Sequence, residues 1–107
     1  MDVHLRRSTD DGETWGPVIV VAYDSMNPCK NQVPVVLPSG RILLLWLWNA
    51  WIPSEDDRTT REFMITWSDD DGLTWAPHVN ITSQVYLSGW RWGGAGPGHG
   101  FVKTRAP

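Results

Sequence analysis

Short runs of apolar, β-branched and aromatic residues divide the chain, and turn-forming residues separate them. Such runs are typical of β-strands. Residues 32–37 and 41–48 are apolar at successive positions on either side of a Pro38-Ser39-Gly40 turn, which indicates strands covered on both faces. We therefore expect strands at residues 3–7, 18–21, 32–37, 41–48, 63–67 and 78–81, and residues 101–104 are a candidate for the start of another.

A pattern of the form S-x-D-x-G-x-T-W-x-P occurs twice, with its two copies 60 positions apart. We call residues 8–17 box 1 and residues 68–77 box 2. Each box lies between two of the expected strands, which predicts a β-hairpin around it. The candidate structural residues are Ser8, Asp10, Gly12, Thr14 and Trp15 in box 1, and Ser68, Asp70, Gly72, Thr74 and Trp75 in box 2.

The residue types of the boxes suit a tight loop. The aspartate can accept hydrogen bonds from backbone N–H groups of its own turn, and the glycine allows a positive φ. The serine and threonine hydroxyls can satisfy further backbone groups. The tryptophan stands at the start of the outgoing strand, where we expect its ring to fill the gap between adjacent sheets. This chemistry predicts a structural role for both boxes.

The strands and boxes together predict an all-β protein made of antiparallel four-stranded units. Residues 32–81 hold one complete unit that ends in box 2, residues 1–21 hold the second half of a unit with box 1, and residues 82–107 lead to the next unit. Four-stranded units recurring at this spacing are typical of the blades of a β-propeller. We therefore expect one complete blade and parts of two others, an incomplete propeller.

Composition and charge exclude several classes of protein. The 107 residues are 41% hydrophobic and 20% charged, unlike a disordered segment. A formal net charge of −3 without a cluster of Lys or Arg speaks against binding to nucleic acid or to an anionic membrane. The longest apolar run, residues 42–48, is far too short to span a bilayer, and nothing near Met1 resembles a signal peptide. Cys29 is the single cysteine, which excludes an internal disulfide. Eight tryptophans in so short a chain indicate packing against neighbouring blades.

The pattern shared by the boxes resembles the Asp-box of sialidases, and flanking segments extend the resemblance over essentially the whole chain. These segments are Leu5-Arg6-Arg7-Ser8, Pro34-Val35-Val36, Gly40-Arg41-Ile42 and Gly96-Pro97-Gly98-His99-Gly100. The resemblance implies a six-bladed β-propeller that acts as an exo-α-sialidase, removing terminal sialic acid from glycoconjugates with retention of configuration. It implies no cofactor and no metal. The implied partners are a sialylated glycan and the other blades of the same propeller.

The same resemblance defines which catalytic groups to look for. Members of the family use a Tyr nucleophile activated by a Glu, an Asp acid/base, and three Arg that clamp the substrate carboxylate, since guanidinium groups pair with carboxylates through two hydrogen bonds. None of these groups matches a position of this sequence: Asp2 aligns with a strand position, and Tyr23 and Tyr86 match no nucleophile motif. We therefore assign no catalytic residue and expect the 107 residues alone to lack sialidase activity.

Secondary contacts with substrate are implied near the first strand of the complete blade, where the family has an Asn-Pro-Cys-Pro motif. Two alignments with that motif are open. Met26-Asn27-Pro28-Cys29 matches it in residue identity, whereas Lys30-Asn31 matches the spacing between the motif and Pro34. We favour Asn31, because the register of a strand is fixed by its pattern. The resemblance adds Glu55, an acidic residue in a loop, and Trp92, an aromatic residue before the Gly-rich loop. The candidate substrate-binding residues are therefore Asn31, Lys30, Asn27, Met26, Glu55 and Trp92.

Other functions are compatible with some of these features. A non-catalytic propeller of the same repeat that binds glycans or proteins is the alternative function. The boxes do not fit an EF-hand calcium loop, because Arg7 and Trp67 stand where the first acidic ligand would be required. We expect His99, in its Gly-rich loop, to make hydrogen bonds rather than to act in catalysis.

Overall fold

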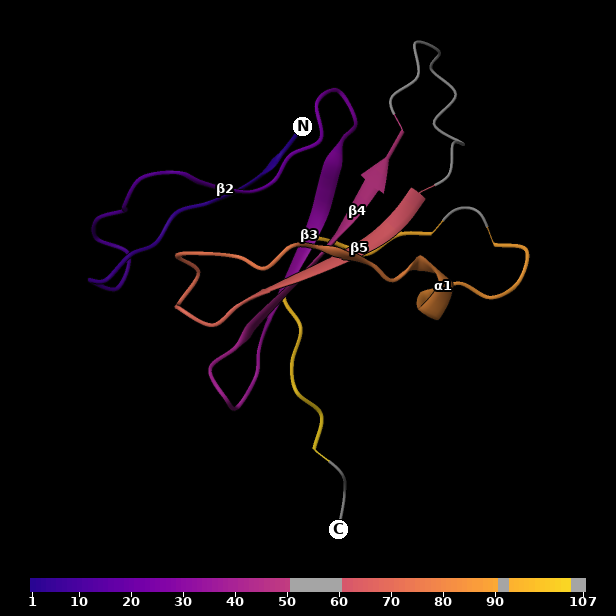
Figure 1. Ribbon diagram of the computed structural model, residues 1–107. Helices are drawn as coiled ribbons and strands as arrows, with labels where there is room; N and C mark the ends of the chain where they lie inside the picture. The colour runs from indigo at the N-terminus through magenta and orange to yellow at the C-terminus, as the bar shows by residue number, and fades with distance from the viewer. Residues whose placement is uncertain (51–60, 91–92, 105–107) are drawn as a thin grey trace.

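The computed structural model describes residues 1–50, 61–90 and 93–104 and consists of two antiparallel sheets and one helical turn (Figure 1). The first sheet has two strands and the second has four, in the order β3-β4-β5-β6. The elements are β1 (Val3–Leu5), β2 (Ile19–Ala22), β3 (Cys29–Val36), β4 (Ile42–Asn49), β5 (Arg61–Ser68), β6 (Val79–Asn80) and α1 (Thr82–Val85).

The four-stranded sheet confirms the predicted antiparallel unit. β4 and β5 pair without interruption from Ile42 opposite Ser68 to Asn49 opposite Arg61. Box 1 lies between β1 and β2, and box 2 lies between β5 and β6. The two boxes therefore occupy equivalent places in the two sheets.

Several details differ from the sequence-based expectation, and β1 and β6 are shorter than the strands expected at residues 3–7 and 78–81. β3 begins at Cys29 rather than at residue 32, because Cys29 and Lys30 already pair with β4. Residues 101–104 form no strand; a strand needs a hydrogen-bonded neighbour, and none of the described residues pairs with this segment. The helical turn α1 after β6 was not expected from the sequence.

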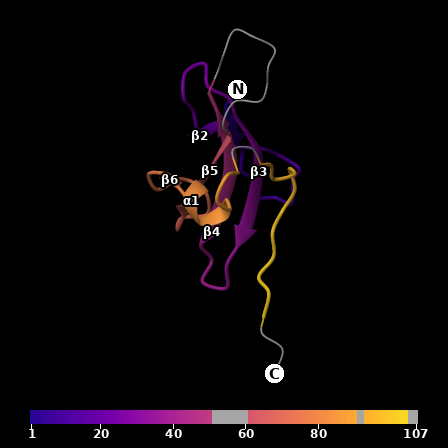
Figure 2. The ribbon, with the colours of Figure 1, turned by 90° about the vertical axis from the view of Figure 1, so that its right-hand side faces the viewer.

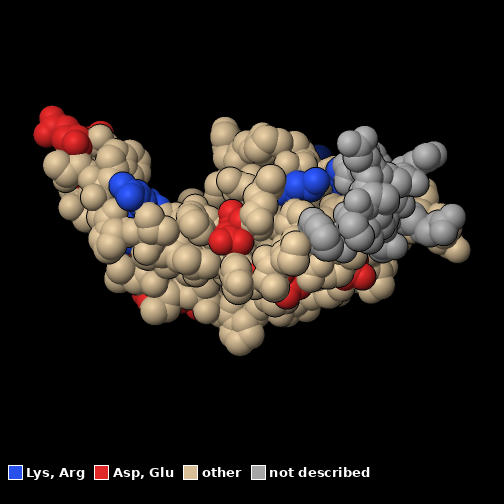
Figure 3. All heavy atoms as spheres, turned by 90° about the horizontal axis from the view of Figure 1, so that it is seen from above, with Lys and Arg blue, Asp and Glu red and all other residues tan. Residues whose placement is uncertain are grey.

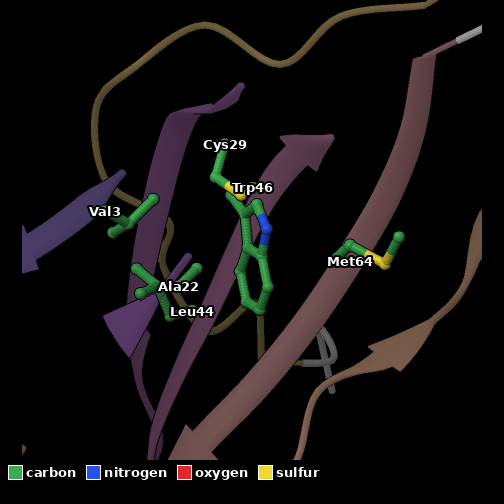
Figure 4. Packing of buried hydrophobic residues seen from close by; sticks show 6 residues of the cluster. All are labelled: Val3, Ala22, Cys29, Leu44, Trp46 and Met64. Atoms are coloured by element: carbon green, nitrogen blue, oxygen red, sulfur yellow. The ribbon is translucent and has the colours of Figure 1, made fainter. Parts of the chain in front are cut away.

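The core lies between the two sheets. Val3 and Ala22 of the first sheet pack against Cys29, Trp46 and Met64 of the second, together with Leu44 (Figure 4). Paired residues point to the same face of a sheet and successive residues to opposite faces, so one face of the four-stranded sheet supplies these contacts. Trp46 is 2% exposed. The burial of this tryptophan between two sheets agrees with the expectation that the tryptophans pack between neighbouring blades.

The two ends of the four-stranded sheet carry different loops. The start of β3, the end of β4 and the start of β5 lie together at one end, because Cys29 pairs with Trp48 and Trp48 with Glu62. The turn at residues 37–40 and box 2 lie at the other end. The C-terminal segment runs beside β3, where the Gly100 N–H donates to the Pro34 oxygen at 2.8 Å (Figure 2). No helix in the described part of the chain is long and apolar enough to cross a membrane.

Candidate functional site

Box 1 is held together by its own side chains. Asp10 Oδ1 accepts hydrogen bonds from the Ser8 hydroxyl at 2.8 Å and from the Thr14 backbone N–H at 2.9 Å. Asp10 Oδ2 accepts the Thr14 hydroxyl. The Ser8 hydroxyl oxygen accepts the Gly12 N–H at 2.8 Å, and Gly12 has a φ of +87°. The loop is therefore a closed network of hydrogen bonds among Ser8, Asp10, Gly12 and Thr14.

Box 2 repeats this network. Ser68, Asp70, Gly72 and Thr74 make the same bonds, at 2.8 Å from the serine hydroxyl to Asp70 Oδ1 and 2.9 Å from the Thr74 N–H. Trp75 Nε1 adds a bond of 3.0 Å to the Gly72 oxygen. Trp75 is half-buried against the core, whereas Trp15 is 59% exposed, contrary to the expectation that both rings fill a gap between sheets. No sheet among the described residues covers box 1.

The hydrogen bonds of the boxes keep their aspartates ionised. Bonds from the threonine hydroxyl, then from the threonine N–H and the serine hydroxyl, lower the pKa of Asp10 to about 2, and the corresponding bonds lower that of Asp70 to about 2. A carboxylate so low in pKa and so fully engaged is a poor proton donor or acceptor at neutral pH. Each box therefore stabilises its own loop, and box 2 lies at the end of the four-stranded sheet remote from the start of β3.

The start of β3 is irregular. The pairing of β3 with β4 shifts between Lys30 and Val33, which leaves Asn31 and Gln32 in a β-bulge. Asn31 has a φ of +57°, in the left-handed region where Asn is better tolerated than most residues. Lys30 and Asn31 are both half-buried. Among the described residues, the Asn31 side chain has no hydrogen-bond partner.

Asn27, the competing candidate, lies in the loop before β3. Its Nδ2 donates to Asp24 Oδ2 at 3.1 Å, and its backbone N–H donates to the Asp24 oxygen at 2.9 Å. Asp24 Oδ2 also accepts a bond of 2.7 Å from Trp48 Nε1. Asn27 is thus part of a turn fixed to the sheet, and Met26 beside it is 59% exposed. Asp24 was not among the residues predicted from the sequence, although an Asp three residues before an Asn is typical of a β-turn.

Glu55 and Trp92 lie outside the described residues. His99 Nδ1 lies 3.2 Å from the Gly100 oxygen, which is a local contact. The other four candidates are close in sequence: Met26 and Asn27 lie in the loop before β3, and Lys30 and Asn31 lie at its start.

Neither tyrosine has the surroundings of a nucleophile. The Tyr86 hydroxyl donates to the Arg61 oxygen at 2.8 Å, and partial burial raises the pKa of Tyr86. Tyr23 is 66% exposed in the loop after β2. Within the described residues, no group of three or more His, Cys, Asp or Glu side chains could hold a metal ion.

The fold and the repeated loops define a class: an all-β chain of antiparallel blades from a β-propeller, with only part of the propeller present. Comparison with solved structures agrees, since the chain superimposes on Hadza microbial sialidase Hz136 with a TM-score of 0.80 at 26% identity, covering 94% of this chain and 24% of that one. A family model described as a BNR repeat-like domain matches residues 1–105. The chain therefore belongs to the BNR repeat-like domain family.

Several curated relatives are named as sialidases. The chain is 31% identical to a sialidase of Bacteroides fragilis, over 97% of this chain and 23% of the relative. It is 30% identical to an exo-alpha-sialidase of Aspergillus fumigatus, over 84% of this chain and 26% of the relative. A sialidase of Paraclostridium sordellii is 32% identical over 78% of the chain. The chain thus spans about a quarter of the length of the relatives it matches.

Proposed function

We propose that the chain is part of an exo-α-sialidase and that its contribution to the site is the start of β3. The observation that carries the proposal is Asn31, held at a positive φ in a bulge with its side chain free of described partners. Bulges and backbone strain of this kind occur preferentially at functional sites. A free amide offers a donor and an acceptor to a polar substrate group such as an N-acetyl group.

The position of the bulge supports this assignment. β3 is the edge strand farthest from β6 in the sheet. In a propeller the first strand of a blade lies next to the central channel. This order supports a place for Asn31 at the channel side, at the end of the four-stranded sheet opposite box 2. Asn27 is less suited, because its amide already donates to Asp24.

No Tyr–Glu pair, acid/base Asp or Arg clamp is assigned in this sequence, and hydrolysis by the family requires these groups. We expect the purified 107-residue chain to release no fluorophore from a fluorogenic sialoside above a mock preparation. Turnover by the purified chain would contradict this part of the proposal. If sialyllactose changes the NMR signals of the chain in a titration and is not hydrolysed, the alternative, a glycan-binding propeller, is favoured.

The role of Asn31 is tested in an active polypeptide that contains this chain. Asn31→Gly keeps the positive φ and removes only the amide, so we expect KM for a sialoside to rise while thermal stability stays unchanged. Asn27→Ala is the matched control and should affect turnover less. If Asn27→Ala weakens turnover more than Asn31→Gly does, the assignment of Asn31 is wrong.

A further inference from the structure

A cavity of about 360 Å³ lies between the end of β2 and the four-stranded sheet. Its buried lining includes Cys29, Trp46 and Met64, which Figure 4 shows on three neighbouring strands. Tyr23 and Asp24, in the linker after β2, line its exposed part. An apolar interior with a few polar groups at the opening is typical of a site for a small molecule.

The walls of this cavity belong to described residues of both sheets. Residues 22–24 form one wall, and β3, β4, β5 and His78 form the other. A strand before β1 would pair with the free edge of β1, as β4 pairs with β5, whereas the cavity lies beside β2. A following blade would pack on the opposite face of the sheet, to which Ile65 and Trp67 point, because both alternate with Met64. We therefore expect the cavity to remain in a longer polypeptide.

Two carboxylates at the cavity have unused oxygens. Glu62 Oε2 accepts a hydrogen bond of 3.0 Å from Asn80 Nδ2, and Asp24 Oδ2 accepts one of 2.7 Å from Trp48 Nε1. The other oxygens, Glu62 Oε1 and Asp24 Oδ1, accept no hydrogen bond from the described residues. The two acids lie at the same end of the sheet, because Trp48, which is bonded to Asp24, pairs with Glu62.

The cavity also lacks a positive charge. No lysine or arginine lines it, and neither Glu62 nor Asp24 forms an ion pair with a described residue. Figure 3 looks onto this end of the molecule and shows acidic atoms at several places on its surface. Unpaired carboxylates in a partly enclosed site attract a cation more strongly than they would in open water, because the local dielectric constant is lower.

Aromatic rings define the kind of cation. Trp46 and Trp48 line the cavity from the same face of β4, and the centre of the His78 ring lies 5.6 Å from that of Trp46. The face of an aromatic ring attracts an organic ammonium ion. A metal ion would need more ligands than two carboxylates, and within the described residues no group of three or more His, Cys, Asp or Glu side chains could hold one.

We propose that this cavity binds a small aliphatic amine in its ammonium form. The ammonium group donates hydrogen bonds to Glu62 Oε1 and Asp24 Oδ1, and the aliphatic chain packs against Trp46 and Met64. The charge thus meets unpaired carboxylates and the chain leaves water for an apolar surface, so both parts of the ligand gain from binding. Asn31 does not line the cavity, and its occupation requires no sialidase activity.

The experiment is a titration of a polypeptide that contains this chain, with n-hexylamine as the ligand and hexanol as its uncharged analogue. Saturation-transfer-difference NMR gives the two dissociation constants at neutral pH. We expect the amine to bind about tenfold more tightly than hexanol, because only the amine gains the charged contacts. The two compounds have the same hydrocarbon chain, so the comparison isolates the ammonium group.

Glu62→Gln and Asp24→Asn test the carboxylates. Each keeps an oxygen for its present hydrogen bonds and removes only the charge, so we expect the fold to be retained. Each should weaken the binding of hexylamine about threefold or more and leave the binding of hexanol unchanged. Glu13→Gln is the matched control, because Glu13 is an exposed acid of box 1 that does not line the cavity.

The methyl NMR signal of Met64 locates the bound amine. We expect this signal to shift when hexylamine is added, and near-ultraviolet circular dichroism checks that each variant is folded. The proposal is wrong if hexylamine binds no more tightly than hexanol, or if Glu13→Gln weakens its binding as much as Glu62→Gln does. An unchanged Met64 signal at saturating hexylamine would place the amine elsewhere and would equally overturn the proposal.

Discussion

Arg7 Nε donates a hydrogen bond of 2.8 Å to the backbone oxygen of Asp71. The residue immediately before box 1 thus holds the tip of box 2, and two segments 64 positions apart are joined. Leu5, two residues earlier, packs on Gly72 beside this bond. The boxes therefore stabilise their own loops and also provide the surface by which one blade receives the next.

Removing this bond should lower the stability of the chain. We expect Arg7→Ala to reduce the free energy of unfolding by about 1 kcal/mol, the usual net value of a hydrogen bond. Urea unfolding followed by tryptophan fluorescence measures the change. Arg6→Ala is the control, because Arg6 is exposed and makes no described hydrogen bond. Equal effects of the two changes would show that the Arg7 bond contributes nothing specific.

Acid should destabilise the chain through the box aspartates. The pKa of Asp10 and that of Asp70 are about 2 in the folded chain against 3.8 ordinarily, so folding favours the ionised carboxylates. Their contribution is fully present above pH 3.8 and is lost as the pH falls through about 2. We expect the melting temperature to fall over that interval.

Variants separate the aspartates from other acid effects. The double change Asp10→Asn and Asp70→Asn should lower the melting temperature at pH 7 and flatten its dependence on pH below 3.8. Asp11→Asn is the control, since the Asp11 carboxylate takes no part in the described bonds of box 1. An unchanged acid slope in the double variant would show that these carboxylates are not responsible.

The sequence predicted the parts of this fold that depend on neighbouring residues. The alternation of strands and the chemistry of the boxes were visible locally, and the strands they imply are present. The difference in exposure between Trp15 and Trp75 was not predictable in this way, because both residues lie in the same local sequence pattern. Leu5 and Arg7 decide the difference by covering one box and not the other, and no local signal reveals a contact over such a separation.

The candidate site was predictable only in outline. Spacing favoured Asn31 over Asn27, and both lie near the start of β3. The bulge itself could not be predicted, because it depends on how Lys30 and Val33 pair with β4 across the sheet. The bond from Trp48 to Asp24, which fixes the competing loop, likewise joins residues distant in sequence.

The Cys29 thiol should react slowly in the folded chain. It is 3% exposed in the core between the sheets, and burial, with the nearby negative charge of Asp24, raises its pKa. Since the thiolate is the reactive form, we expect labelling by a disulfide reagent at pH 8 to be at least about tenfold slower than in urea. A Cys29→Ala, Val36→Cys chain is the control and should label rapidly. Rapid labelling of Cys29 in the folded chain would contradict its placement in the core.

Asn31 offers a test of the bulge that does not depend on function. At a φ of +57°, a β-branched side chain clashes with its own backbone, so Asn31→Val should cost about 1–2 kcal/mol of stability. Asn31→Gly should be tolerated, because glycine adopts a positive φ freely. Gln32→Val is the matched control in the same bulge, and as an exposed strand position it should change stability by less than about 0.5 kcal/mol. If urea unfolding gives the same stability for Asn31→Val and Gln32→Val, Asn31 does not hold the left-handed conformation, and the argument for its free amide fails with it.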